Sequence, residues 1–120
     1  MLSSYKELRV WSRSVDLVIE IYKLTKSFPR EEIYGITSQM RRAAVAIPSN
    51  IAEGYNRGHL KEYIQFLRIA LASATELETQ LIVSEKLRYL SDPDFKRIES
   101  ITIEVMKMLR KLLIKLCPKP

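Results

Sequence analysis

Apolar side chains recur along this chain at alternating spacings of three and four residues. A helix turns once in about 3.6 residues, so this spacing places the apolar positions on one helix face. A sustained repeat of about 3.5 residues is typical of helices packed as in coiled coils. The four repeats are Leu8, Trp11, Val15, Val18, Tyr22; Ile33, Ile36, Met40, Ala43, Ile47; Tyr63, Leu67, Ala70, Ala74, Leu77, Leu81; and Ile98, Ile101, Val105, Met108, Leu112. We therefore expect four amphipathic helices.

Prolines and glycines divide these helices. Pro29 should end the first helix, because the residue before a proline is disfavoured in the α region. Gly54 and Gly58 frame a turn, and the third helix is expected over about 59–88. Asp92 is the expected N-cap of the last helix, with Pro93 at its first position.

Short turns between four helices predict that consecutive helices run antiparallel. The shared 3.5-residue repeat favours near-parallel packing with a left-handed twist. We therefore predict an all-α fold in which residues 1–120 form a single domain, an up-down-up-down left-handed four-helix bundle.

The second helix carries a proline in its interior. Pro48 has no N–H group, so the carbonyl of Ala44 loses its donor, which costs about 3 kcal/mol in a helix interior. The apolar stripe nevertheless continues to Ile51. We expect the helix to be kinked at Pro48, or to restart there, rather than to end.

The same helix is apolar on nearly every side. Val45 and Ala52 point away from its apolar stripe, and Ala46 lies between the two faces. Such a helix is not typical of the surface of a monomer. We therefore predict that Val45, Ala46 and Ala52 form an interface with another copy of the chain.

Three longer strings carry a family resemblance. They are 39–44 (QMRRAA), 47–54 (IPSNIAEG) and 73–78 (SATELE), accompanied by 8–11 (LRVW) and 22–25 (YKLT). Together the strings resemble the bacterial four-helix-bundle proteins first noted in intervening sequences of 23S ribosomal RNA genes. The resemblance implies a ring-shaped homopentamer. Relatives include accessory proteins of diversity-generating retroelements, which work with a reverse transcriptase and RNA.

The composition narrows the class of protein. A chain of 120 residues is long enough for one domain with its own core. No apolar run approaches the roughly 20 residues that a membrane span needs, and there is no signal-peptide pattern. The single cysteine, Cys117, fits a reducing compartment. We expect a soluble, cytoplasmic protein.

The formal net charge of +6 is concentrated near the two ends of the chain. One basic group is Lys6, Arg9 and Arg13, and the other is Lys107, Arg110, Lys111, Lys115 and Lys119. In an up-down-up-down bundle these groups lie at the same end. We predict that they merge into a positive rim that contacts nucleic-acid phosphates. The alternative is that these cations interact favourably with the negative end of the helix dipole and simply form a face that is exposed to solvent.

Polar residues flank the apolar stripe of the second helix. Arg42, Asn50 and Glu53 lie on one side of it, and Glu76 belongs to the neighbouring third helix. We predict a structural network in which Arg42 pairs with Glu53 or Glu76, and Asn50 serves the backbone freed by Pro48. The alternative is a pair of carboxylates for acid–base chemistry or a metal.

The sequence offers little for catalysis or cofactor binding. His59 is the only histidine and Cys117 the only cysteine, which leaves neither a plausible nucleophile–base pair nor a zinc site. We expect no enzyme activity, no metal and no cofactor. The predicted function is an oligomeric, pentameric scaffold that binds RNA or a nucleoprotein partner. The alternative is a purely protein-binding assembly module with no nucleic-acid role.

Overall fold

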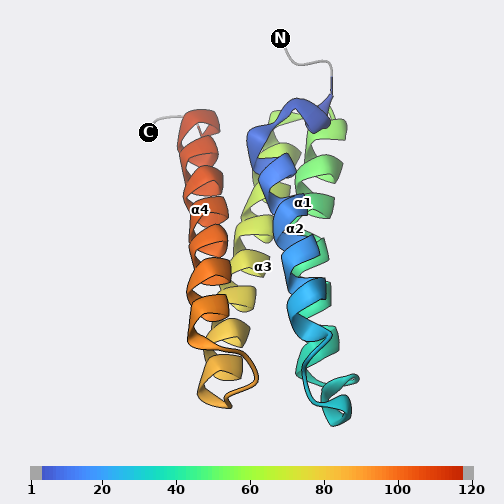
Figure 1. Ribbon diagram of the computed structural model, residues 1–120. Helices are drawn as coiled ribbons and strands as arrows, with labels where there is room; N and C mark the ends of the chain where they lie inside the picture. Colours follow the sequence, from blue (N-terminus) through green and yellow to red (C-terminus); the bar gives the residue numbers. More distant parts are fainter. Residues whose placement is uncertain (1–3, 118–120) are drawn as a thin grey trace.

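The computed structural model describes residues 4–117, and this part of the chain is helical with no strand. Its helices are α1 (Arg9–Thr25), α2 (Ile36–Asn56), α3 (Leu60–Lys86) and α4 (Asp92–Leu116), with 3-10 turns η1 (Tyr5–Glu7) and η2 (Arg30–Glu32). Each α-helix runs opposite to the one before it (Figure 1). The predicted all-α four-helix bundle is confirmed. Its Cα atoms span 44 × 23 × 21 Å.

One hydrophobic core runs along the bundle between the four helices. The largest fully buried apolar side chains are Leu17, Ile21, Met40, Ile47, Ile51, Leu67, Leu77, Leu81, Ile98, Val105 and Leu109. The helices pack in sequence order around this core, with α1 also touching α4. The contact between α2 and α3 is the most extensive, and the contact between α1 and α4 is the least extensive of the four.

The apolar face of α1 differs from the predicted one. The buried positions of α1 are Val10, Ser14, Leu17, Ile21, Leu24 and Thr25. In the predicted stripe, Trp11 and Val18 are only partly buried and Tyr22 is 40% exposed. The true core stripe is hidden in the sequence because it contains Ser14, whose hydroxyl donates to the Trp11 carbonyl at 2.8 Å. The predicted stripe lies beside it and flanks α2, where the Arg41 guanidinium sits 4.7 Å from the Tyr22 ring centroid.

α2 is continuous from Ile36 to Asn56, with Pro48 buried inside it. The prediction that the helix does not end at the proline is confirmed, whereas the kink and the left-handed twist of the bundle stay predictions. Met40, Ala43, Ile47 and Ile51 are buried as expected. Ile33 was assigned to the core wrongly: it is 48% exposed, because residues 30–32 form a 3-10 turn and α2 starts only at Ile36.

The start of α4 lies one residue from the predicted position. Ser91, not Asp92, is the N-cap, and its hydroxyl accepts a hydrogen bond from the Asp94 N–H at 3.2 Å. Asp92 and Pro93 then occupy the first two helical positions, where an acidic side chain and a missing N–H are both favourable.

The C-terminal part of α2 lies very close to α3 at Gly54. A Cβ at this position would lie 2.6 Å from the Cβ of Phe66 and 3.3 Å from Cδ1 of Tyr63. The atom it would meet first is fixed to the α3 backbone, so no side-chain rotation can relieve the collision. The absence of a side chain at Gly54 therefore sets how closely the two helices approach.

Candidate functional site

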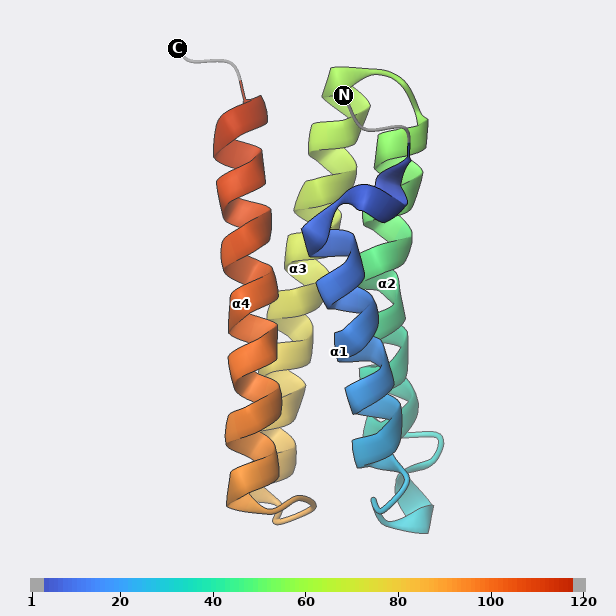
Figure 2. The ribbon, with the colours of Figure 1, turned by 45° about the horizontal axis from the view of Figure 1, so that its top comes forward.

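The structure brings parts of the two basic groups together. The start of α1 and the end of α4 lie at the same end of the bundle (Figures 1 and 2). A hollow of about 440 Å³ opens there between the two helices, lined by Arg9 of α1 and by Lys111 and Lys115 of α4 together with apolar side chains. Lys6 is exposed in η1 nearby in sequence, and Lys119 lies outside the described residues.

Arg13 does not join these free cations. Its Nε donates to Glu104 of α4 at 2.9 Å, and its Nη1 lies 3.4 Å from Asp16. The hydrogen bond to Glu104 is the main cause of the raised pKa of Arg13. Arg13 therefore forms an ion pair that ties α1 to α4, and its contact with phosphates stays a prediction.

A second ion pair of this kind lies further along the contact between α1 and α4, which is called the seam below. Arg97 of α4 donates to Glu20 of α1 and also lies 3.4 Å from Asp94. The hydrogen bond to Glu20 is the largest cause of the raised pKa of Arg97. Sequence reasoning missed this pair because its members are 77 positions apart and neither belongs to a local motif.

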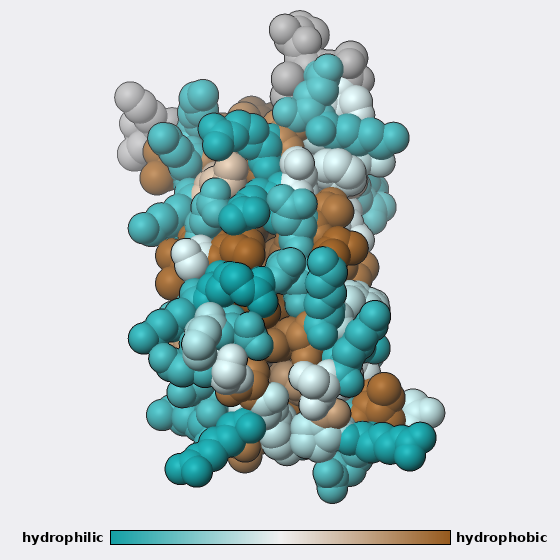
Figure 3. Space-filling view, in the orientation of Figure 1, coloured by the Kyte–Doolittle hydropathy of each residue, from teal (hydrophilic) through white to brown (hydrophobic). Residues whose placement is uncertain are grey.

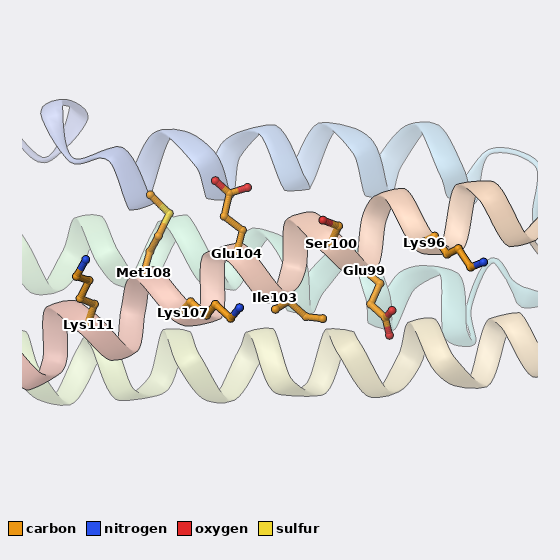
Figure 4. Close-up of a pocket in the computed structure, with 8 residues that line it drawn as sticks. All are labelled: Lys96, Glu99, Ser100, Ile103, Glu104, Lys107, Met108 and Lys111. Carbon is orange, nitrogen blue, oxygen red and sulfur yellow. The ribbon is translucent and has the colours of Figure 1, made fainter.

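The predicted basic row on α4 is exposed. Lys107, Arg110, Lys111 and Lys115 all face solvent, and no ion pair forms with any of them in residues 4–117. An open hollow of about 650 Å³ follows this row, and every residue that lines it belongs to α4 (Figure 4). Glu99 and Glu104 line it beside Lys107 and Lys111. The outer face is therefore mixed in charge, and the purely basic surface is confined to the last turns of α4.

The predicted polar network does not form in the described part of the chain. Arg42 is exposed and has no ion pair there, whereas Glu53 pairs with Arg57 at 3.5 Å. Arg42 and Glu53 are eleven positions apart, which is about 16 Å along a helix axis and too far for a direct contact. Glu76 instead accepts a hydrogen bond from Gln80 at 3.5 Å.

Asn50 does serve the backbone, but at a different carbonyl from the expected one. Its Nδ2 donates to the carbonyl of Ala46 at 2.7 Å. The carbonyl that loses its donor to Pro48 is that of Ala44, so this interaction does not replace the missing hydrogen bond.

The predicted subunit interface remains only partly covered in the single chain. Val45 is 39% exposed, and Ala46 and Ala52 are partly exposed. Other large apolar side chains are exposed on α1 and α3, among them Ile19, Ile69, Ile82 and Val83. Contact with a second copy stays a prediction.

The described residues contain no group of three or more potential metal ligands. His59 is exposed at the N-cap of α3 and makes no side-chain capping bond. The thiol of Cys117 lies 3.6 Å from Nη2 of Arg68, which is not a general base. Within residues 4–117, no helix is long and apolar enough to cross a membrane.

Comparisons with known proteins address the whole bundle. Residues 6–111 match the family model described as 23S rRNA-intervening sequence protein. A crystal structure from Bacteroides thetaiotaomicron, of a protein of unknown function from the S23 ribosomal protein family, superposes with a TM-score of 0.81. It is 24% identical and the match covers 88% of this chain and 95% of that one, so it shows the shared fold. No curated protein sequence matches the chain.

Proposed function

The chain belongs to the 23S rRNA-intervening sequence protein family, and from that premise we propose that it is a non-enzymatic, cytoplasmic scaffold whose basic end binds RNA. The proposal treats the bundle as a homo-oligomer, a pentamer by resemblance to the family. RNA, or a complex that contains RNA, is then the proposed partner.

The observation that carries this proposal is the meeting, at one end of the bundle, of cations that have no ion-pair partner within residues 4–117. Arg9, Lys111 and Lys115 line one hollow, and no acidic residue follows Glu104 in the sequence. Lysine and arginine side chains that neutralise phosphates release condensed counterions, which favours binding at low salt. In an oligomer this end is repeated, and several weak contacts on one body strengthen each other through effective concentration.

A salt titration of RNA binding tests the proposal. We expect the intact protein to bind a mixed RNA pool, with an affinity that falls by roughly 10³-fold or more between about 50 and 200 mM salt if six or more phosphates are engaged. Replacing Lys107, Lys111 and Lys115 by glutamine should flatten the plot of log affinity against log salt. All three side chains are exposed, so the fold should be retained.

The matched control removes three exposed lysines from the opposite end, at Lys23, Lys26 and Lys86. This control has the same net charge as the first variant, and its salt slope should stay close to that of the unmodified protein. Equal slopes for the two variants would show that net charge alone attracts RNA. No binding by the unmodified protein at low salt would reject the nucleic-acid function.

The oligomer makes a separate prediction. Val45→Glu should disrupt assembly, because it places a charge on a partly exposed apolar position of α2 that we assign to the subunit interface. Lys111→Glu, on the exposed face of α4, should leave assembly unchanged. Sedimentation or light scattering measures the mass. A monomer of 14.0 kDa for the unmodified protein, or equal assembly of both variants, would contradict the assignment.

A purely protein-binding assembly module is the second candidate function. It is favoured by the apolar side chains that α3 exposes, among them the neighbouring Ile82 and Val83. Adjacent exposed apolar groups are typical of protein contacts. This candidate predicts assembly without steeply salt-dependent RNA binding, so the same titration separates the two.

A further inference from the structure

The seam between α1 and α4 is held by ion pairs along part of its length and is open at one end. Near the end where α1 finishes and α4 begins, Arg97 of α4 pairs with Glu20 of α1. Further along, Arg13 of α1 pairs with Glu104 of α4. At the end where α1 starts, no such pair crosses the seam in residues 4–117, and the hollow of about 440 Å³ lies open. Figure 3 shows hydrophobic surface between the polar side chains on this face of the molecule.

The seam is open here because the chain before α1 leaves it. η1 contacts α2 as well as α1, and Figure 2 shows it crossing towards α2 rather than α4. The ring of Tyr5 packs edge-on against Trp11, with centroids 5.3 Å apart, which holds the turn on that flank of α1. In the part of the chain that the structure describes, the last turns of α4 therefore face only the first turn of α1, across the hollow.

The hollow is lined by both apolar and basic side chains. Its apolar side chains are Leu8, Val10, Met108, Leu112 and Ile114. Ile114 is 79% exposed, whereas Val10 is nearly buried, so the apolar surface runs from the core out to solvent. Arg9 stands on the α1 side, and Lys111 and Lys115 stand one helical turn apart on the α4 side. None of the three cations has an ion-pair partner among the described residues.

We propose that this hollow, called the groove below, binds an amphipathic helix of a partner protein. The apolar stripe of that helix lies on the apolar lining, which forms the floor of the groove. Its acidic residues lie against Arg9, Lys111 and Lys115. Helix-in-groove recognition uses apolar anchors spaced three and four residues apart, and the unbranched Met108 side chain adapts to such anchors. Acidic side chains one turn apart on the incoming helix match the spacing of the two lysines. The proposal goes beyond RNA binding by the basic end.

The apolar floor points to a protein ligand of the groove in addition to the RNA that its cations attract. Phosphates would satisfy the cations but leave the apolar floor in water. Bound bases of single-stranded RNA usually stack on aromatic side chains, and this hollow is lined by aliphatic and thioether side chains. The acidic amphipathic helix is complementary to both parts of the lining.

The experiment uses the full chain and three synthetic helical peptides. The first has a leucine stripe flanked by glutamates, the second has the same stripe flanked by lysines, and the third keeps the glutamates but has serines in place of the stripe. Fluorescence anisotropy gives the affinities, and methyl NMR at Met108 and Ile114 locates the bound peptide. We expect the first peptide to bind about tenfold or more tightly than the other two and to shift both methyl signals.

Substitutions then test each part of the lining. Ile114→Ser, and separately Lys111→Glu combined with Lys115→Glu, should each weaken binding of the first peptide by about tenfold or more. The matched controls Ile69→Ser and Lys86→Glu alter exposed positions of α3 and should change it by less than about twofold. The double charge reversal should also improve binding of the lysine-flanked peptide.

Failure to bind the first peptide, methyl shifts confined to other residues, or equal binding of the stripeless peptide would overturn the proposal. The proposal would also be overturned if the α3 control variants lost as much affinity for the first peptide as the groove variants do. Ile114→Ser removes no charge, so it should leave the salt slope of RNA binding intact. The peptide and RNA proposals can therefore fail independently.

Discussion

Leu17→Ala should lower the free energy of unfolding by about 2–5 kcal/mol, because it removes a fully buried side chain from the centre of α1 and leaves a cavity. Leu17 belongs to the face that α1 turns towards the core. Urea denaturation followed by circular dichroism measures the loss. The protein concentration must be held constant, because oligomer formation would add to the apparent stability.

Val18→Ala is the matched control for this prediction. Val18 lies next to Leu17 but in the stripe that flanks α2, and it is only partly buried. We expect its substitution to cost about 1 kcal/mol or less, because neighbouring solvent already reaches the site. A larger loss at Val18 than at Leu17 would show that α1 presents the other stripe to the core.

Gly54→Ala should destabilise the bundle by up to about 2 kcal/mol, although alanine is the better helix former. In an exposed helix interior the change would be worth up to about 1 kcal/mol in favour of alanine. Here the added Cβ would lie 2.6 Å from the Cβ of Phe66, so α2 and α3 would have to separate. Overpacking of this kind typically costs about 1–3 kcal/mol, which outweighs the helix propensity.

The sign of the Gly54→Ala effect is the test. Thermal unfolding should show a lower midpoint than for the unmodified chain, whereas Ser49→Ala, on the exposed side of α2, should show an equal or slightly higher one. A stabilised Gly54→Ala variant would mean that the two helices are not in close contact at this position.

The number of helices and their approximate ends could be predicted from the sequence because they depend on local chemistry. Pro29 and Gly58 act on their own turns, whereas Gly54, which was expected to frame a turn, lies inside α2. The repeat in α3 contains large and small apolar residues without a polar interruption. Its positions Leu67, Ala70, Ala74, Leu77 and Leu81 are all fully buried. Local signals of this strength were sufficient for the fold class.

The face that α1 turns to the core could not be predicted in the same way, and that of α4 only in part. In α4, Ile98 and Val105 are buried as expected, whereas Ile101, Met108 and Leu112 are only partly buried. Each of these two helices has a buried hydroxyl within its core face, Ser14 in α1 and Thr102 in α4. Thr102 donates to the carbonyl of Ile98 in its own helix at 2.8 Å, so burial leaves its hydroxyl satisfied. Such residues are polar in the sequence pattern but behave as core residues, because their hydrogen bonds stay within one helix.

The candidate site was predicted in part. The up-down-up-down order correctly implied that the start of α1 and the end of α4 lie together. The partners of individual charges were not predictable, because Arg13 reaches Glu104 across 91 positions of sequence. The apolar floor of the groove was also missed. Its residues Leu8, Met108 and Leu112 belong to the predicted apolar repeats and were expected in the core, but they are only partly buried beside the hollow, where η1 turns towards α2.

The seam between α1 and α4 also has a consequence for the order in which the chain folds. Helices α2 and α3 are neighbours in sequence and make the largest contact, so they can associate after closing only a short loop. The α1–α4 contact joins the two extremes of the chain, and its ion pairs close loops of 91 and 77 residues. Closing a longer loop costs more chain entropy, and the α1–α4 contact that offsets this cost is the least extensive of the four. We infer that the binding groove belongs to the last part of the bundle to assemble and the first to open.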